Sequence, residues 1–596
     1  MSPTTKPIPA VLRARAALAA GLALLALARV GLPWLPGSWA WSLDVLRHLS
    51  PVAAWLPWAL AAAVLAHAWW RRAAWPARAG DWIARHPWAP AVAALALAAL
   101  VLALPDDTHM TGDFILRRRA IDEARDPASV FPQSLPLDVW LHYTVPRWLF
   151  TQMGLLALDE ARLWGALDAA AIGWLAVAFA RAFAFEGAAA LAATAGVAFG
   201  GWLALFTGYG KGLAELVVLV LAIAAWGADV AGRDRAHLRL GIATALAVAI
   251  HRAGMLLIPA AWIAGGLALV RYGPSPRRVL GMALPLAALA IVAAHAFAIA
   301  RGYDVEHHLA AVADPLRAWD LANVIQLSAP LALCLPLLAI GFGVGIPRRR
   351  EALPLVALAV TLAALAVAVH PQQGVVRDWD VFAPSAMALA ALTAWLAGEA
   401  LRETPAVAPP PRARSDRRAP ARGAASDPRS RAGALALAAA LACAVPAIQW
   451  LLHLHDVRHG MARIEAIAAG PPERSSLERA RLWDYLGVRD AWLDDWAGSA
   501  RAFRQSAALL PTPRVLDQWG RAELRVGNWE GARQVYRTMI ARQPDSPTGW
   551  RGLATAVTRM DDRDSARVAV EGLLRLVPND REARALLDFL DQERAR

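Results

Sequence analysis

Long apolar runs alternate with short polar segments over the first three quarters of the chain. An α-helix needs about 20 mostly apolar residues to cross a bilayer, and most of these runs have that length. The pattern therefore predicts an all-α, polytopic bundle of about thirteen transmembrane helices. The predicted spans are 16–36, 50–70, 88–105, 163–184, 187–207, 212–229, 240–251, 253–270, 279–300, 325–346, 352–370, 381–398 and 433–453.

Two of these runs, 240–251 and 253–270, are short and meet at His251-Arg252. We interpret them as half-helices that together bring the chain back to the side it left. Helices that break at membrane depth usually line a cavity. The break is therefore a candidate part of a functional site.

After Leu454 the apolar runs give way to a repeat of 33 to 34 residues. The repeated positions are Trp483-x-x-Leu486-Gly487, Leu516-x-x-Trp519-Gly520 and Trp550-x-x-Leu553-Ala554, the small residues Ser499, Ala532 and Ala566, then Phe503, Tyr536 and Val570, and the prolines Pro511, Pro544 and Pro578. This pattern resembles three tetratricopeptide repeats over 479–579, followed by a capping helix at 580–594. Such an α-solenoid usually presents a concave surface to a protein partner, although a spacer without a ligand is the alternative.

The composition supports a membrane bundle, since hydrophobic residues make up 58% of the chain and charged residues only 18%. The net charge of +13 comes largely from basic residues in short loops between apolar runs, which is the pattern of the positive-inside rule and not of a nucleic-acid-binding face. All basic clusters fall on one side of the predicted spans. The clusters are Lys6/Arg13/Arg15, Arg71/Arg72/Arg78/Arg85, Arg233/Arg235/Arg239, Arg271/Arg277/Arg278, Arg348/Arg349/Arg350 and the run from Arg402 to Arg431.

This topology predicts a multi-pass protein of a bacterial cytoplasmic (inner) membrane, with the N-terminus in the cytoplasm and the C-terminal repeats on the periplasmic side. Five regions follow from it. They are the N-terminal spans 1–87, a core of 88–400 with an outward first loop at 106–162, a disordered linker rich in Pro, Ala and Arg at 401–432, a last span at 433–454, and the repeat domain at 455–596.

The predicted outward loops hold ionisable residues at span ends, which are candidates for function because they are costly there. The first loop begins with Asp106, Asp107 and Asp113, and its segment 136–143 has the pattern of an amphipathic interfacial helix. The other candidates are Lys211, with Glu215 one turn later, His251, Arg252, His370, Arg377, Asp378 and Asp380.

Residues 88–400 resemble the GT-C superfamily of integral-membrane glycosyltransferases. The resemblance is carried by Gly112-Asp113, Leu116-Arg117 and Pro136-Leu137-Asp138 in the first loop, and by the turn Arg377-Asp378-Trp379-Asp380. It implies transfer of a sugar from a polyprenyl-phosphate donor to a glycan, lipid or protein acceptor on the outer face of the membrane. The two N-terminal spans would be an addition to this core.

Inverting sugar transfer needs a carboxylate that removes the acceptor proton and cations that stabilise the leaving lipid phosphate. Within the resemblance, Asp113 is the first candidate for the base, followed by Asp107 and Asp106. The candidates for binding the lipid phosphate or orienting the substrates are Arg377, Arg252, Lys211, His251, His370, Asp378 and Asp380. Some relatives are metal-assisted, but no ligand spacing in the sequence defines a metal site.

Each candidate has a structural alternative. Asp106 and Asp107 could cap the following helix, Lys211 could anchor at the interface, and Arg117 to Arg119 are expected to extend to lipid headgroups. For the whole chain, the alternatives are a polymerase or ligase of lipid-linked glycans and a non-enzymatic scaffold or transporter. Cys334 and Cys443 lie in apolar runs, which argues against a disulfide framework or a zinc site.

Overall fold

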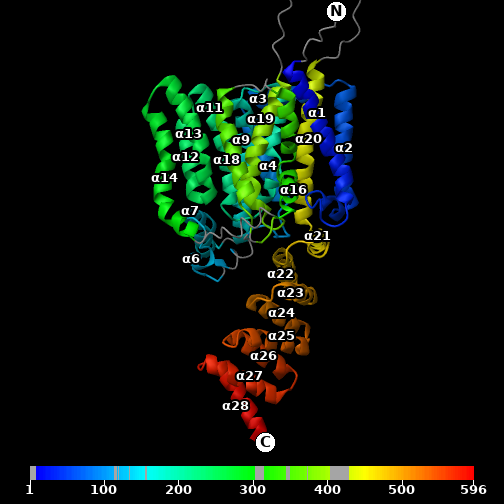
Figure 1. Cartoon of the computed structure of the whole chain (residues 1–596), viewed down its shortest axis with the longest axis vertical. Coiled ribbons are helices and arrows are strands. Elements are labelled where there is room, and N and C mark those ends of the chain that lie inside the picture. The colour runs from blue at the N-terminus through cyan, green and yellow to red at the C-terminus, as the bar shows by residue number, and fades with distance from the viewer. Residues whose placement is uncertain are drawn as a thin grey trace, which may run out of the picture. The chain divides into compact units, whose positions relative to one another are not determined.

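The structure is a computed structural model that describes residues 9–112, 117, 120–121, 123–132, 134–154, 157–301, 314–343, 349–371, 373–402 and 428–595. Every regular element in these ranges is a helix. The chain divides into two compact units (Figure 1). The first unit contains the chain up to Gly460 except for two short segments, 36–39 and 372–374, which belong with residues 461–596 to the second unit.

The first unit is a bundle of apolar helices. Its α-helices are α1 (Ala10–Gly31), α2 (Pro51–Trp70), α3 (Trp75–Arg85), α4 (Ala89–Ala103), α6 (Pro127–Val130), α7 (Pro136–Val139), α8 (Val145–Met153), α9 (Ala157–Ala182), α10 (Gly187–Ala198), α11 (Leu213–Arg233), α12 (His237–Ile250), α13 (Ile258–Tyr272), α14 (Pro276–Arg301), α16 (Arg317–Ser328), α17 (Leu335–Phe342), α18 (Leu353–Ala368), α19 (Ala383–Leu401) and α20 (Pro428–His455). Shorter 3-10 or π turns join several of them. These are η1 (Leu32–Trp34), η2 (Asp44–His48), η3 (Trp140–Thr144), η4 (Gly201–Phe206), η5 (Arg252–Leu257), η6 (Pro330–Cys334), η8 (Arg350–Ala352) and η9 (Trp379–Phe382).

Among the described residues, nine helices are long and apolar enough to cross a membrane, and α3 with α4 forms a tenth candidate bent by 106°. Three shorter apolar helices are found at Gly187–Ala198, His237–Ile250 and Pro330–Phe342. Each of the thirteen predicted spans overlaps one of these helices or the bent pair, although the helix in 187–207 ends at Ala198 and the one in 325–346 covers only Pro330–Phe342. Their length and composition make them candidates, and the crossing itself stays a prediction.

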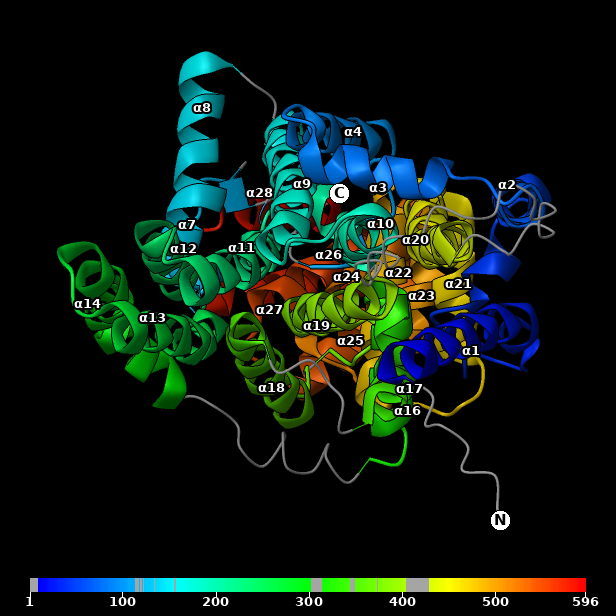
Figure 2. The same ribbon diagram turned by 90° about the horizontal axis from the view of Figure 1, so that it is seen from above.

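Small residues allow the central helices to pack closely. In α10 all residues but one are buried, and nine of its twelve residues are Ala or Gly. Figure 2 shows α10, α11 and α19 inside the bundle, with α2 and α14 at its periphery. The peripheral helices expose large apolar side chains such as Ile291, which is 84% exposed. Exposed apolar area of this kind marks a surface that another apolar phase or partner could cover.

The predicted basic clusters meet at one end of the bundle. Contacts link every described cluster into one network. They include Arg15 Nε to the Ala400 carbonyl (2.7 Å), Arg402 to the Phe183 carbonyl (2.8 Å), Arg181 to the His86 carbonyl (2.6 Å), Arg85 to Glu186 (2.9 Å), Arg233 to the Arg181 carbonyl (3.0 Å), Arg349 to Glu399 (3.2 Å) and Arg278 to Asp234. We call this the basic end. The linker between α19 and α20 lies largely outside the described residues.

The broken pair α12 and α13 starts and finishes at this basic end. His237, the first residue of α12, lies 2.8 Å from Asp234, and Arg278 donates to the carbonyl of Tyr272, the last residue of α13, at 2.9 Å. His251 between them has an extended backbone, with φ −149° and ψ 140°. The pair therefore turns at His251 and returns the chain, as the sequence predicted.

The second unit is a series of antiparallel helix pairs. Its helices are α22 (Ser476–Trp492), α23 (Trp496–Leu509), α24 (Pro513–Val526), α25 (Trp529–Arg542), α26 (Pro547–Arg559), α27 (Arg563–Leu576) and α28 (Arg581–Ala595). They follow α21 (Val457–Ala469), which begins in the first unit and belongs to the second from Met461 on. The pairs α22/α23, α24/α25 and α26/α27 correspond to the three predicted repeats, and α28 to the predicted capping helix.

The repeats pack in register because residue sizes compensate across each pair. Gly487 faces the ring of Phe503 and Gly520 faces the ring of Tyr536, at a distance where a Cβ on either glycine would overlap the ring. In the third repeat the corresponding residues are Ala554 and Val570, a larger residue opposite a smaller one. Each second helix also begins with an N-cap whose side chain accepts a backbone N–H. The three caps are Asp495, Asn528 and Asp562.

Candidate functional site

The first two acidic residues of the outward loop hold the loop against neighbouring helices. Asp106 Oδ1 accepts the backbone N–H groups of Thr108 and His109, both at 2.8 Å. Asp107 pairs with Arg162 of α9 at 3.3 Å and with His455 of α20 at 2.8 Å. Asp106 thus caps a turn and not a following helix, and Asp107 is held by ion pairs and not by a capping contact.

Asp380 is the centre of a buried polar cluster at the opposite end of the bundle from the basic end. Its side chain is 1% exposed. Its Oδ2 accepts a hydrogen bond from the Tyr209 hydroxyl and lies 3.5 Å from Lys211 Nζ. Among the described residues its Oδ1 is buried without a hydrogen-bond partner. A buried carboxylate is stabilised by a cation beside it, and Lys211 supplies that cation.

The first loop reaches this cluster at Thr111 and Gly112. Trp379 Nε1, next to Asp380, donates to Thr111 Oγ1 at 3.0 Å, and both side chains are buried. Gly112 has φ +77° and packs on the Tyr209 ring so closely that a Cβ would lie 2.1 Å from Cε2. The described stretch therefore ends at Gly112, a residue that touches the Asp380 cluster. Asp113 itself lies outside the described residues.

A second cluster surrounds Asp138 in α7. Arg117 Nη2 lies 2.8 Å from Asp138 Oδ2, and both side chains are at most 6% exposed. Asp138 Oδ1 accepts the backbone N–H of Gly212 at 2.9 Å, which fixes α7 against the start of α11. Burial alone would raise the pKa of Asp138, but the Arg117 guanidinium, aided by His142 and Ser134, lowers that pKa to about 2. Asp138 therefore stays ionised at neutral pH.

His142 extends this cluster towards α11. It lies one helical turn after Asp138, and its Nε2 is 3.0 Å from Glu215 Oε1 and 4.0 Å from Asp138 Oδ1. The imidazole is thereby held between two carboxylates that come from the first loop and from α11.

The helix break at His251 joins the same region. His251 Nδ1 accepts the backbone N–H of Ala253 at 3.1 Å. The charges of Arg252, Lys211 and Asp138 all act on His251. Arg252 is exposed and Lys211 half-buried, so both cations are accessible beside carboxylates contributed by distant segments.

His370 belongs to a separate contact. Its Nδ1 lies 3.1 Å from Nη1 of Arg317, a buried side chain of α16 that also donates to carbonyls at the end of α18 and stacks over Phe382. Arg377 and Asp378 are half-buried in the turn before η9. Of the ten candidates, the structure brings Lys211, His251, Arg252 and Asp380 together, and it ties Asp106, Asp107 and His370 into structural contacts.

The expectation for Arg117 was wrong. It does not extend to a headgroup region but is 4% exposed, paired with Asp138 and stacked 4.7 Å over the Phe131 ring. Burial is favoured because the guanidinium finds both a carboxylate and an aromatic face inside the loop. Arg118 and Arg119 lie outside the described residues.

Neither a group of metal ligands nor an exposed thiol is present in the described part of the chain. No group of three or more His, Cys, Asp or Glu side chains is arranged there to hold a metal ion. Cys334 and Cys443 are both buried and free.

Sequence reasoning did not assign roles to Asp138, His142, Tyr209 and Arg317. The spacing of Asp138 and His142, four residues apart on one helix face, was a usable signal. No such signal marked Tyr209 and Arg317, because their partners lie about fifty or more residues away in sequence.

Comparisons with known proteins identify part of the second unit. The family model "Tetratricopeptide repeat" matches residues 513–556, which contain α24, α25 and the beginning of α26. This stretch is a tetratricopeptide repeat. The rest of the second unit continues its packing in register, so this unit is a solenoid of a type that suggests protein partners.

The comparisons say nothing decisive about the first unit. No curated protein matches the chain. Among solved structures, the crystal structure of the APC/C hetero-tetramer Cut9-Hcn1 aligns with 10% sequence identity over 80% of this chain and 82% of that chain, with a TM-score of 0.20. A TM-score this low carries no inference about the arrangement of the bundle.

Proposed function

We propose that the chain is a glycosyltransferase embedded in a bacterial cytoplasmic membrane, similar to the GT-C superfamily. It transfers a sugar from a polyprenyl-phosphate donor to an acceptor on the non-cytoplasmic face. The observation that carries this proposal is the convergence of Lys211, Arg252 and Asp380 with the first loop at the end of the bundle opposite the basic end.

The charge distribution supports the orientation. The positive-inside rule assigns the end richer in short basic loops to the cytoplasm, so the Asp380 cluster would face outward. Helix α20 ends at His455, beside Asp107. The chain therefore leaves the bundle at the outward end, and the repeat module would follow on that side, where a protein partner or acceptor could be recruited.

We assign a role to each residue of the site from its exposure and its charge. Lys211 and Arg252 would bind the lipid phosphate and stabilise its charge as the sugar leaves. Asp380 and Tyr209 would position Lys211. Asp113 remains the proposed base that takes the proton of the acceptor hydroxyl, because its neighbour Gly112 contacts Tyr209. Asp106 and Asp107 would hold the loop in place.

The test is sugar transfer from a polyprenyl-phosphate-linked donor by membranes containing the full-length protein. Asp113→Asn is expected to lower transfer by at least about a hundredfold, the range of a lost general base. The matched control is Asp126→Asn, which removes an exposed carboxylate from the same loop. Full transfer by the Asp113 variant at equal expression would remove Asp113 as the base.

A second candidate function is a membrane scaffold that recruits proteins through its repeats. It is favoured by the family match, which covers only the repeat module. A scaffold predicts no transfer by the unmodified protein with any polyprenyl-phosphate sugar, and partner capture that depends on residues 476–595 alone.

A further inference from the structure

A groove of about 280 Å³ lies between α1, α16 and α17, away from the candidate site. Figure 2 shows these three helices on the opposite side of the bundle from α12 and α13, which flank Arg252. The groove walls are predominantly apolar. Leu24 and Trp319 on its lining are 57% and 40% exposed. The groove is therefore accessible from the lateral surface of the bundle.

The α1 wall of the groove forms one continuous stripe. Gly21, Leu25 and Ala28 of α1, and Leu32 at the start of η1, follow each other at helical spacing and all line it. From Gly21 to Leu32 the helix rises by about 16 Å. A stripe of this length, with a volume several times the roughly 30 Å³ of one water molecule, suits a segment of a single extended acyl chain.

Among the side chains that line the groove, Gln326 has a hydrogen-bond donor that is buried without a partner in the described residues. Gln326 belongs to α16 and is 5% exposed, and the donor is its Nε2. The neighbouring polar residues Asn323 and Ser42 differ from Gln326 because they already bond to each other. Asn323 Oδ1 accepts from Ser42 N at 3.0 Å and from Ser42 Oγ at 2.8 Å. A buried donor of this kind is stabilised by an acceptor oxygen on whatever fills the groove.

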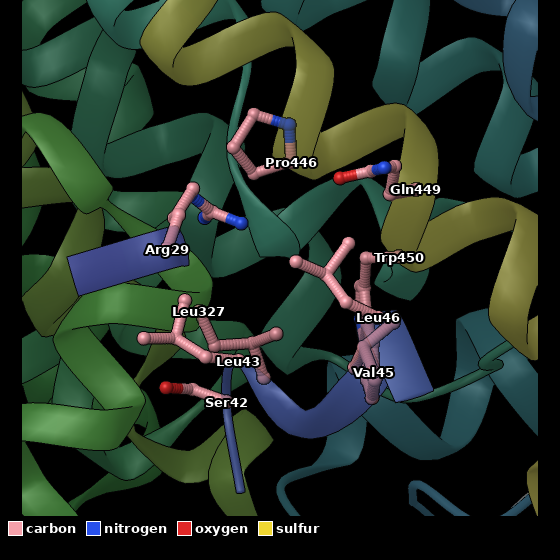
Figure 3. A pocket seen from close by; sticks show the side chains of 9 residues that line it. All are labelled: Arg29, Ser42, Leu43, Val45, Leu46, Leu327, Pro446, Gln449 and Trp450. Carbon is pink, nitrogen blue, oxygen red and sulfur yellow. The ribbon is translucent and has the colours of Figure 1, made fainter. Parts of the chain in front are cut away.

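A cation on α1 lies beside this groove without lining it. Arg29 follows Ala28 on α1 and lines a small adjoining cavity, shown in Figure 3, that shares Ser42 and Leu43 with the groove. In the described part of the chain no carboxylate lies within ion-pair distance of Arg29, and its guanidinium is 5.7 Å from the centre of the Trp58 ring. A cation in apolar surroundings is costly unless an anion accompanies it.

We propose that this groove binds one acyl chain of an anionic phospholipid, with the lipid phosphate at Arg29 and an ester oxygen accepting from Gln326. Arg29 stands near the end of the α1 stripe closest to Trp34, so the headgroup lies there and the chain runs back towards Gly21. The ester oxygen separates this ligand from a polyprenyl phosphate, whose chain has no acceptor for Gln326. The proposal goes beyond sugar transfer but shares with the proposed function the placement of the bundle in a membrane.

The test is native mass spectrometry of the full-length protein titrated with phosphatidylglycerol, phosphatidylcholine or polyprenyl phosphate. The unmodified protein is expected to prefer phosphatidylglycerol to phosphatidylcholine by about fivefold, the value of one basic residue near an anionic headgroup. Arg29→Gln should abolish this preference. Gln326→Leu should weaken the binding of both phosphatidylglycerol and phosphatidylcholine. Ala28→Phe should fill the groove and remove the tightly bound lipid.

Leu27→Phe is the matched control, because Leu27 is 67% exposed and does not line the groove. Equal lipid retention by the Ala28 and Leu27 variants, an unchanged preference in Arg29→Gln, or tighter binding of polyprenyl phosphate than of phosphatidylglycerol would overturn the proposal. Sugar transfer by the same variants is measured in a separate assay, so that the lipid site and the proposed function can be judged independently. A variant that loses lipid and keeps transfer supports the lipid site, and loss of transfer by the Asp113 variant alone concerns only the proposed function.

Discussion

At the residue scale, Gly112 connects the first loop to the Asp380 cluster. Its φ of +77° and its contact with Tyr209 both disfavour a side chain. Gly112→Ala should displace the Tyr209 ring and disturb Lys211 through Asp380. We expect sugar transfer to fall at least tenfold, measured as the initial rate at saturating donor.

The control for Gly112 is Gly154→Ala in the same loop. Gly154 has φ +65°, but nothing lies within 4 Å of the Cβ it would gain. It therefore carries the same backbone strain, roughly 1–2 kcal/mol, without the clash. If both variants lose transfer equally, strain alone explains the effect and the Tyr209 contact does not matter.

Asp138 gives a prediction about acid stability. Its folded pKa of about 2 is below its ordinary value of 3.8. Its contribution to stability is therefore complete above pH 4 and is lost as the pH falls towards 2, on the order of 2 kcal/mol in total. Asp138→Asn should lower the melting temperature at pH 7 and reduce the fall in melting temperature between pH 5 and pH 3. A fall as steep as in the unmodified protein would show that other carboxylates control acid stability.

At the element scale, α22 of the first repeat carries a carboxylate that is partly protonated near neutral pH. Burial, with the nearby charges of Asp495 and Glu465, raises the pKa of Asp490 to about 6, although Arg501 opposes the rise. A raised folded pKa favours folding below pH 4 and disfavours it as the pH rises through 6.

Asp490→Asn should therefore raise the melting temperature of the repeat unit at pH 7.5 and leave it nearly unchanged at pH 4. Differential scanning calorimetry of the full chain measures both. The comparison is Asp545→Asn, which removes an exposed carboxylate from the same unit. An equal gain in both variants would mean that net charge, and not burial, is responsible.

The elements themselves could largely be predicted from sequence, because apolar runs and repeat spacing are local properties. The broken pair at His251 and the Gly–aromatic register of the repeats both follow from residues close together in the chain. The contacts of the candidate site could not be predicted in this way, because they join residues far apart in the chain. Asp380 and Tyr209, for example, are 171 residues apart. Arg117 shows the limit most clearly, since the same residue suits a lipid headgroup or a buried ion pair until the position of Asp138 is known.

At the scale of the whole molecule, the difference between the two ends of the bundle predicts its orientation. Ser129 lies in the first loop and Arg235 at the basic end, and both are exposed. With an impermeant maleimide on intact spheroplasts, Ser129→Cys should be labelled and Arg235→Cys should not. The two native cysteines are buried and should give a low background. The reverse labelling pattern would place the Asp380 cluster in the cytoplasm.

The most direct measurement combines chemistry and orientation. A short-chain, membrane-impermeant polyprenyl-phosphate sugar is added outside right-side-out or inverted vesicles that contain the full-length protein. The account predicts transfer of the sugar by right-side-out vesicles, and by inverted vesicles only after detergent opens them. Transfer by sealed inverted vesicles, or no transfer by either kind once opened, would contradict it.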